Sequence, residues 1–227
     1  NAKGIAGIAP DAKILSVKVL DASGSGTIAN VINGIKYAVN IGAKIINMSL
    51  GIAKKFLSSS LLGAFQDAIN YALGKGTITV VAAGNESVDS NTTAPAGLTS
   101  TIAIGATNDK NTKPYWSNKY PDLSAPGDTI GSLKAGGGYV YMSGTSMASP
   151  YVAGAAALLY SKFSSLYSAW TGSQIYNDIY TRLTRSSIDL GKKGYDSSFG
   201  YGLLDAYAAL TYSSGGTSSF EDSSSTN

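Results

Sequence analysis

A serine set among small residues is the first candidate for chemistry in this sequence. Ser146 lies in the stretch GTSMASPYVAG, residues 144–154, just ahead of a proline and an alanine-rich run. Alanine favours helices and proline is tolerated in their first turn, so the pattern predicts a helix that starts at or just after Ser146 and has Pro150 in its first turn. Unpaired N–H groups and the helix dipole stabilise negative charge at such a position. A hydroxyl there can act as a nucleophile, with helix capping as the alternative role.

A serine nucleophile needs a general base, and the composition counts 0 histidines. Base assistance is typically worth about a hundred- to ten-thousandfold in rate. Lysine replaces histidine in some serine enzymes, but the block around Ser146 contains neither lysine nor acid. Asp128, Asp196 and Asp205 adjoin turn or helix signals, where solvation or capping explains them better. We therefore expect this chain alone to be inactive.

Composition narrows the remaining classes of function. The 227 residues, 44% of them hydrophobic, can bury one sizeable core and fit a single α/β domain. The net charge of +3 is spread thinly, which argues against a nucleic-acid partner. With 0 cysteines and 0 histidines, disulfides and zinc are disfavoured and only metals with oxygen ligands remain. No apolar run has the length of a membrane span, and no GxGxxG or Walker loop indicates a nucleotide.

The elements that must position Ser146 begin with an alternating pattern. Apolar stretches predict strands at 14–20, 43–50 and 76–85, and helical periodicity predicts helices at 27–39 and 59–73. Strands that alternate with helices favour a parallel sheet covered on both faces. The predicted fold class is therefore α/β, with three layers and a mostly parallel central sheet.

The second half of the chain has a different texture. Shorter strands are predicted at 100–107, 121–127 and 138–144, separated by turns that contain glycine or proline. Residues 212–227 are rich in serine, glycine and threonine and have little apolar surface, so we expect a flexible tail or linker there, after a domain at 1–211.

The block GTSMASPYVAGAAALL resembles the nucleophile block of the subtilisin-like serine proteases, and no GxSxG elbow supports an α/β-hydrolase instead. Further blocks are similar to that family in the same order: GIAPDAKILSVKVLDASGSG, IINMSLG, VVAAGNES, APAGLTSTIAIGAT, LSAPG and GYGLLDAYAAL. The resemblance implies a serine endopeptidase that acts on protein or peptide substrates. It makes Ser146 the nucleophile, with its own N–H and the Asn85 side-chain amide as the two oxyanion donors.

The resemblance also implies where substrate binds. An edge segment would pair with an extended peptide main chain: Ser49, Leu50 and Gly51. Small residues would line the first specificity pocket and leave room for a large apolar or aromatic side chain: Ala82, Ala83 and Gly84. The Ala94–Pro95 bond resembles a family segment with a cis peptide near that pocket.

Members of the family order their catalytic residues Asp, His, Ser along the chain. Both earlier positions would precede Asn1, so the resemblance implies a fold incomplete at its N-terminus and a missing segment that carries the Asp and the His. The family block usually has a histidine where this chain has Tyr151, but that histidine is not the catalytic base. A catalytically inactive subtilase-like domain that binds peptides or serves as a scaffold remains the alternative.

The resemblance finally implies a location and a cofactor. Family members are secreted, some of them attached to the cell surface, and many are made with a propeptide. Calcium is the cofactor to expect, because the family stabilises surface loops with it through oxygen ligands. Two candidate loops resemble such sites. The first offers part of a site, from Asn1, Lys3 and Ile5, and the second comprises Ala96, Leu98 and Thr101.

Overall fold

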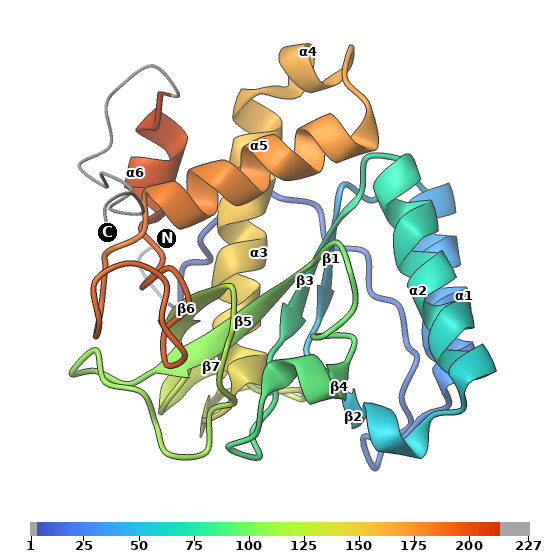
Figure 1. The fold of residues 1–227 in the computed structure, drawn as a ribbon, viewed down its shortest axis with the longest axis horizontal. Coiled ribbons are helices and arrows are strands. Elements are labelled where there is room, and N and C mark those ends of the chain that lie inside the picture. Colours follow the sequence, from blue (N-terminus) through green and yellow to red (C-terminus); the bar gives the residue numbers. More distant parts are fainter. Residues whose placement is uncertain (1–3, 214–227) are drawn as a thin grey trace, which may run out of the picture.

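The computed structural model describes residues 4–213 (Figure 1). The helices are α1 (Ile28–Asn40), α2 (Ser59–Gly74), α3 (Thr145–Lys162), α4 (Ser164–Tyr167), α5 (Gly172–Arg185) and α6 (Ala206–Thr211), with short 3-10 turns η1 (Lys54–Phe56) and η2 (Ser90–Thr92). The strands are β1 (Ile45–Met48), β2 (Ile52–Ala53), β3 (Ile78–Ala82), β4 (Thr93–Ala94), β5 (Thr101–Thr107), β6 (Leu123–Pro126), β7 (Ile130–Leu133) and β8 (Tyr139–Met142).

The central sheet has the order β1-β3-β5-β6, and each neighbouring pair is parallel. Its inner strands, β3 and β5, are buried along their whole length because both faces of the sheet are covered. Ile78 and Val80 of β3 pack into the cluster that contains α3, whereas Val81, the next residue along the strand, packs into the cluster that contains α1 and α2. This alternation is the two-residue period of a strand.

Helices cover both faces of this sheet, which confirms the predicted three-layer α/β fold. Figure 1 shows α1 and α2 on one side and α3 with α5 on the other. Local sequence sets where three of these helices begin. The hydroxyls of Thr27 and Ser58 cap α1 and α2, and Thr171 forms a capping box with Gln174 at the start of α5.

The predicted strand at 14–20 is wrong. Residues 14–20 contain no strand, and within the described residues no backbone–backbone hydrogen bond joins them to another segment. An apolar run becomes a strand only where a neighbouring strand bonds its N–H and C=O groups, and within the described residues 14–20 makes no such bonds. The side chains nearby are unusually exposed: Ile14 is 88% exposed, Ile5 46% and Leu15 41%.

A hairpin next to the Ser146 block was missed in part. The prediction covered β8 but not β7, which pairs with it antiparallel. β7 contains a glycine and ends before the Gly136–Gly138 turn, where all three glycines have positive φ, so its apolar pattern is weak. The hairpin matters for position, because β8 ends two residues ahead of Gly144 and leads the chain directly into α3.

Two further expectations concern the ends of the fold and the membrane. In the described part of the chain, no helix combines the length and apolarity that crossing a bilayer requires. The last helix, α6, ends at Thr211, where the predicted tail begins. Most of that tail, residues 214–227, lies outside the described residues.

Candidate active site

The site lies where the carboxyl ends of two parallel strands meet the start of α3. β1 ends at Met48 and is followed by Ser49, and the neighbouring β3 ends at Ala82, three residues before Asn85. Loops at the carboxyl ends of parallel strands are where α/β sheets bind ligands. Ser146 is the second residue of α3, so its backbone N–H has no acceptor within the helix.

Pro150 lies deeper in the helix than predicted. It is the sixth residue of α3, beyond the first turn, because the helix begins at Thr145. Proline has no N–H, so the carbonyl of Ser146, four residues earlier, loses its helical partner. The Ser49 hydroxyl supplies the replacement, donating to the Ser146 carbonyl oxygen at 2.8 Å. The candidate nucleophile is thereby held at its backbone by a strand end as well as by its helix.

A short hydrogen-bonded chain extends this connection. The Asn47 side-chain amide donates to the Ser49 hydroxyl at 3.1 Å, and its oxygen accepts the Ser149 hydroxyl at 2.6 Å. The end of β1 therefore contacts the first two turns of α3 through four polar side chains or carbonyls. These roles of Asn47 and Ser149 escaped the sequence analysis, because the contacts join segments about a hundred residues apart, with separations of 97 and 102.

The Asn85 side chain is oriented by Thr145. Its Oδ1 accepts the Thr145 backbone N–H at 2.9 Å and the Thr145 hydroxyl at 3.0 Å. The same hydroxyl accepts the Gly84 N–H at 3.0 Å, which directs its own hydrogen to Asn85. With Oδ1 engaged twice, the Nδ2 group is the end of the amide left to donate elsewhere. Thr145 was missed as a site residue although it sits inside the GTS motif.

Two N–H donors, Asn85 Nδ2 and the Ser146 backbone N–H, lie next to the space that a side chain on Gly144 would fill. A Cβ placed on Gly144 would lie 3.5 Å from Asn85 Nδ2 and 3.6 Å from Ser146 N. Glycine leaves that space free, and an atom there would face both donors at the positive end of α3. Such a pair of donors is the arrangement that stabilises an oxyanion in acyl transfer. The structure thus brings together Ser146 and Asn85, the two residues that the sequence singled out for chemistry.

The Ser146 hydroxyl has no basic partner within residues 4–213. Its one hydrogen-bond contact is the Ser49 carbonyl oxygen, 3.4 Å away. Ser146 itself is half-buried, whereas Asn85 is exposed. Within residues 4–213, the Ser146 hydroxyl therefore has no hydrogen-bonded group that could take its proton.

Comparison with known proteins identifies the family of this site. The sequence pattern of the subtilase family, peptidase S8, matches residues 1–202. The chain belongs to the subtilase family. A thermophilic serine proteinase from Bacillus sp. (strain AK1) is 40% identical over 214 residues, covering 93% of this chain and 49% of that protein. Subtilisin E from Bacillus subtilis (strain 168) is 38% identical over 214 residues, covering 92% of this chain and 52% of that protein.

A solved structure agrees with the sequence comparisons. The crystal structure of a lanthipeptide protease matches with a TM-score of 0.76 and 30% identity, covering 90% of this chain and 71% of that one. This subtilase chain spans about half the length of the two curated relatives, 49% of one and 52% of the other.

In the two segments expected to bind substrate, most side chains are buried or bonded within the fold of this subtilase. Leu50 packs against the core on the α1 and α2 side, the Ser49 hydroxyl is bonded to α3, and Gly51 is exposed. In the other segment Ala83 is fully buried, Ala82 nearly so, and only Gly84 is partly exposed. The Ala94–Pro95 bond is cis, as predicted.

The second candidate calcium loop does not fit the ion as it is arranged. The carbonyl oxygens of Ala96 and Leu98 converge on the buried Thr101 hydroxyl at 3.3 and 2.9 Å, so that hydroxyl already holds the loop together. Calcium needs six to eight oxygens and usually carboxylates among them. The described residues contain no cluster of three or more acidic or other metal-binding side chains. Of the first candidate loop only Ile5 is described, since Asn1 and Lys3 lie outside residues 4–213.

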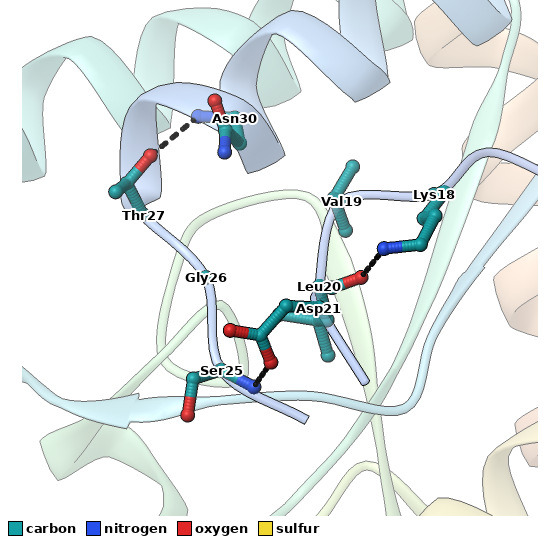
Figure 2. A pocket seen from close by; sticks show the side chains of 8 residues that line it. All are labelled: Lys18, Val19, Leu20, Asp21, Ser25, Gly26, Thr27 and Asn30. Carbon is teal, nitrogen blue, oxygen red and sulfur yellow. Dashed lines mark hydrogen bonds between the residues drawn. The ribbon is translucent and has the colours of Figure 1, made fainter. Parts of the chain in front are cut away.

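One pocket of the described residues is lined by none of these site residues. It has a volume of about 530 Å³ and is formed by the segments 18–21 and 25–30 at the start of α1 (Figure 2). The Asp21 carboxylate in its wall accepts the Ser23 hydroxyl and the backbone N–H groups of Ser23 and Ser25. These bonds, that of the Ser23 hydroxyl first, lower the pKa of Asp21. The carboxylate is thus occupied by its own turn.

Proposed function

We propose that this subtilase chain is the C-terminal portion of the catalytic unit of a serine endopeptidase. Ser146 is the nucleophile, and Asn85 Nδ2 and the Ser146 N–H are the oxyanion donors. The observation that carries the proposal is the space above Gly144, which both donors border at 3.5 and 3.6 Å from the position of a Cβ. A scaffold has no need for two converging donors beside a serine hydroxyl.

The reaction follows from these positions. The Ser146 Oγ attacks the carbonyl carbon of a peptide bond and gives its proton to a general base, while the carbonyl oxygen becomes an oxyanion between the two donors. The C–N bond then breaks, and the amine leaves with the proton that the base returns. Water hydrolyses the resulting ester by the same route, which releases the acid and restores the Ser146 hydroxyl.

The base and the aspartate that orients it come from an upstream segment in this proposal. The support is chemical: the sequence has 0 histidines, and the Ser146 hydroxyl contacts only a carbonyl. The chain alone should then be inactive, because base assistance is worth about a hundred- to ten-thousandfold. The partners of the complete protein are this segment, protein or peptide substrates and a propeptide, and the location is extracellular.

Substrate recognition would rely on the peptide main chain. The segment 49–51 has its side chains engaged inside the fold or absent, so backbone pairing with an extended peptide is the mode open to it. Ala82, Ala83 and Gly84 would form the floor of the first specificity pocket, and their small size would admit a large apolar or aromatic side chain. Calcium binding stays a proposal for the loop with Asn1, Lys3 and Ile5.

A catalytically inactive peptide-binding domain is the second candidate. It is favoured by one observation, the lack of any basic partner for the Ser146 hydroxyl within residues 4–213. Labelling with a fluorophosphonate distinguishes the two functions, because the reagent reacts only with an activated serine.

The test uses the complete polypeptide that contains this chain, freed of any propeptide. It should hydrolyse unstructured peptides and label at Ser146, and the Ser146→Ala variant should do neither. Asn85→Ala should lower kcat by about a hundredfold or more with little change in KM, because the amide acts on the transition state. A folded, complete protein that neither hydrolyses nor labels would leave the inactive peptide-binding domain as its function.

A further inference from the structure

We propose that Asn118 is a positioning residue for the oxyanion donor Asn85. The inference rests on the proposed function, and nothing in the sequence motifs of the site points to Asn118. It follows from a set of contacts that join the segment before β6 to the loop after β3, which carries Asn85. This loop comprises residues 83–88.

Both polar groups of the Asn118 side chain are hydrogen-bonded to this loop. Asn118 is fully buried. Its Nδ2 donates to the Ala83 carbonyl at 2.8 Å, and its Oδ1 accepts the N–H groups of Glu86 at 2.9 Å and Val88 at 3.1 Å. Its backbone N–H also donates to the Gly84 carbonyl at 3.0 Å. Asn118 therefore fixes the backbone immediately before and immediately after Asn85, without touching the Asn85 side chain.

Glu86 closes the arrangement from the other side. Its Oε2 accepts the Asn85 backbone N–H at 2.8 Å and Nδ2 of Asn118 at 3.2 Å. Gly84 has a positive φ of 107°, and a Cβ on it would collide with both Asn118 and Glu86. The loop can pass this close to the buried amide only because residue 84 is glycine.

The loop needs such support because Asn85 itself is exposed. Asn85 is held at its side chain by Thr145, and at its backbone by the contacts of Asn118 and Glu86. An oxyanion donor must keep its place to within a fraction of an ångström, and a misplacement of about 1 Å can cost roughly a hundredfold in rate. A polar side chain that is fully buried and fully bonded is rigid, so it can supply that precision from behind the loop.

A double-mutant cycle on the complete, propeptide-free polypeptide tests the inference. Asn118→Ala should lower kcat by about tenfold or more, because the loop then shifts the Asn85 donor. In the Asn85→Ala background the same substitution should cost less than about twofold, since its effect passes through the Asn85 amide. Equal losses in both backgrounds would overturn the proposal.

Ser90→Ala is the matched control. Ser90 is buried and its hydroxyl donates to the Tyr120 carbonyl at 2.8 Å, so it joins the same two segments just beyond the loop. Its removal should lower the melting temperature without changing kcat in either background. A fall in kcat equal to that of Asn118→Ala would show that general stability is responsible and would refute the positioning role.

Two further measurements keep the inference testable. If Asn118→Ala does not fold, Asn118→Asp retains the acceptor for Glu86 and Val88 but loses the donor to Ala83, and the same cycle applies. If the complete wild-type protein proves inactive, the proposed function fails. Amide hydrogen exchange then tests whether Asn118 positions the loop. Exchange at residues 85–88 should rise at least about tenfold in the Asn118 variant and stay unchanged in Ser90→Ala. Equal protection in both would overturn the proposal.

Discussion

At the scale of single residues, the absent side chain of Gly144 matters as much as the side chains around it. A methyl group on Gly144 would lie 3.5–3.7 Å from Asn85 Nδ2, Ser146 N and the Met147 sulfur, which are ordinary contact distances, although the φ of 157° at Gly144 adds backbone strain to any substitution. It would therefore occupy the space proposed for the oxyanion. Gly144→Ala should lower kcat of the complete protein by about a hundredfold or more, comparable to loss of a donor. Kinetics on a peptide substrate measure this, with circular dichroism to confirm the fold. Unchanged kcat would place the oxyanion elsewhere.

Ser146 and Asn85 could be found from the sequence, and Asn118 could not. Ser146 sits in a block whose small residues, proline and alanines predict a helix start, and Asn85 closes an apolar strand beside it in the family pattern. Asn118 lies in a turn region with no pattern of its own. Its value comes from contacts with residues about 30 to 35 positions away, which only the fold brings together.

At the scale of elements, the end of β1 and the start of α3 share one hydrogen bond that compensates for Pro150. Ser49→Ala removes the donor to the Ser146 carbonyl and should lower the free energy of unfolding by about 1 kcal/mol. Pro150→Ala restores an N–H that can bond this carbonyl, so Ser49→Ala should cost less in that background. Urea unfolding of the four proteins in a cycle measures the coupling. Additive losses would show that the carbonyl is not shared in this way.

The Asp122 carboxylate bonds both β5 and α5, and its ionisation makes the free energy of unfolding depend on pH. Its carboxylate accepts the Ala103 N–H at 2.7 Å and the Tyr180 hydroxyl at 2.8 Å, yet burial dominates and raises the pKa of Asp122. The folded protein therefore holds this proton more tightly than the unfolded chain. Between the ordinary carboxyl pKa of about 3.9 and the raised value, the free energy of unfolding should fall as pH rises.

The difference between wild type and Asp122→Asn isolates this contribution. Both proteins should carry Ser146→Ala to prevent self-digestion, and urea unfolding should be followed from about pH 4 to pH 7. The asparagine variant should gain stability relative to its parent as pH rises, because its side chain does not ionise. A constant difference across the range would mean that the Asp122 proton is not linked to folding.

At this scale, α1, α2 and the inner strands could be predicted because their periodicity is strong, and α3 could be predicted from its alanine-rich run, whereas α4, α5 and α6 were not predicted. The strand expected at 14–20 failed for the opposite reason: its apolar pattern is real, but a strand also requires a bonded neighbour. β7 was missed because a glycine inside it and a glycine-rich turn after it weaken the two-residue pattern.

At the scale of the whole molecule, the apolar side chains near residues 5–15 indicate a surface that another segment should cover. Ile5, Ile14 and Leu15 are exposed, and 14–20 offers its backbone to no neighbour within the described residues. The isolated chain should therefore bind a hydrophobic dye, and the complete polypeptide should bind several-fold less. Fluorescence at matched concentrations, with Ile14→Ser as a control that lowers binding in the isolated chain only, measures the effect. Equal dye binding by both proteins would contradict it.

The proline inside α3 has a consequence for motion. Because the Ser146 carbonyl is held by Ser49, the backbone of the candidate nucleophile and the segment proposed to pair with peptide are fastened to each other directly. The Ser49 hydroxyl thus joins two segments that are 97 positions apart along the chain. A peptide that shifts residues 49–51 as it binds would therefore move the Ser146 backbone with them. Substrate binding and the orientation of the serine would be coupled in a single motion.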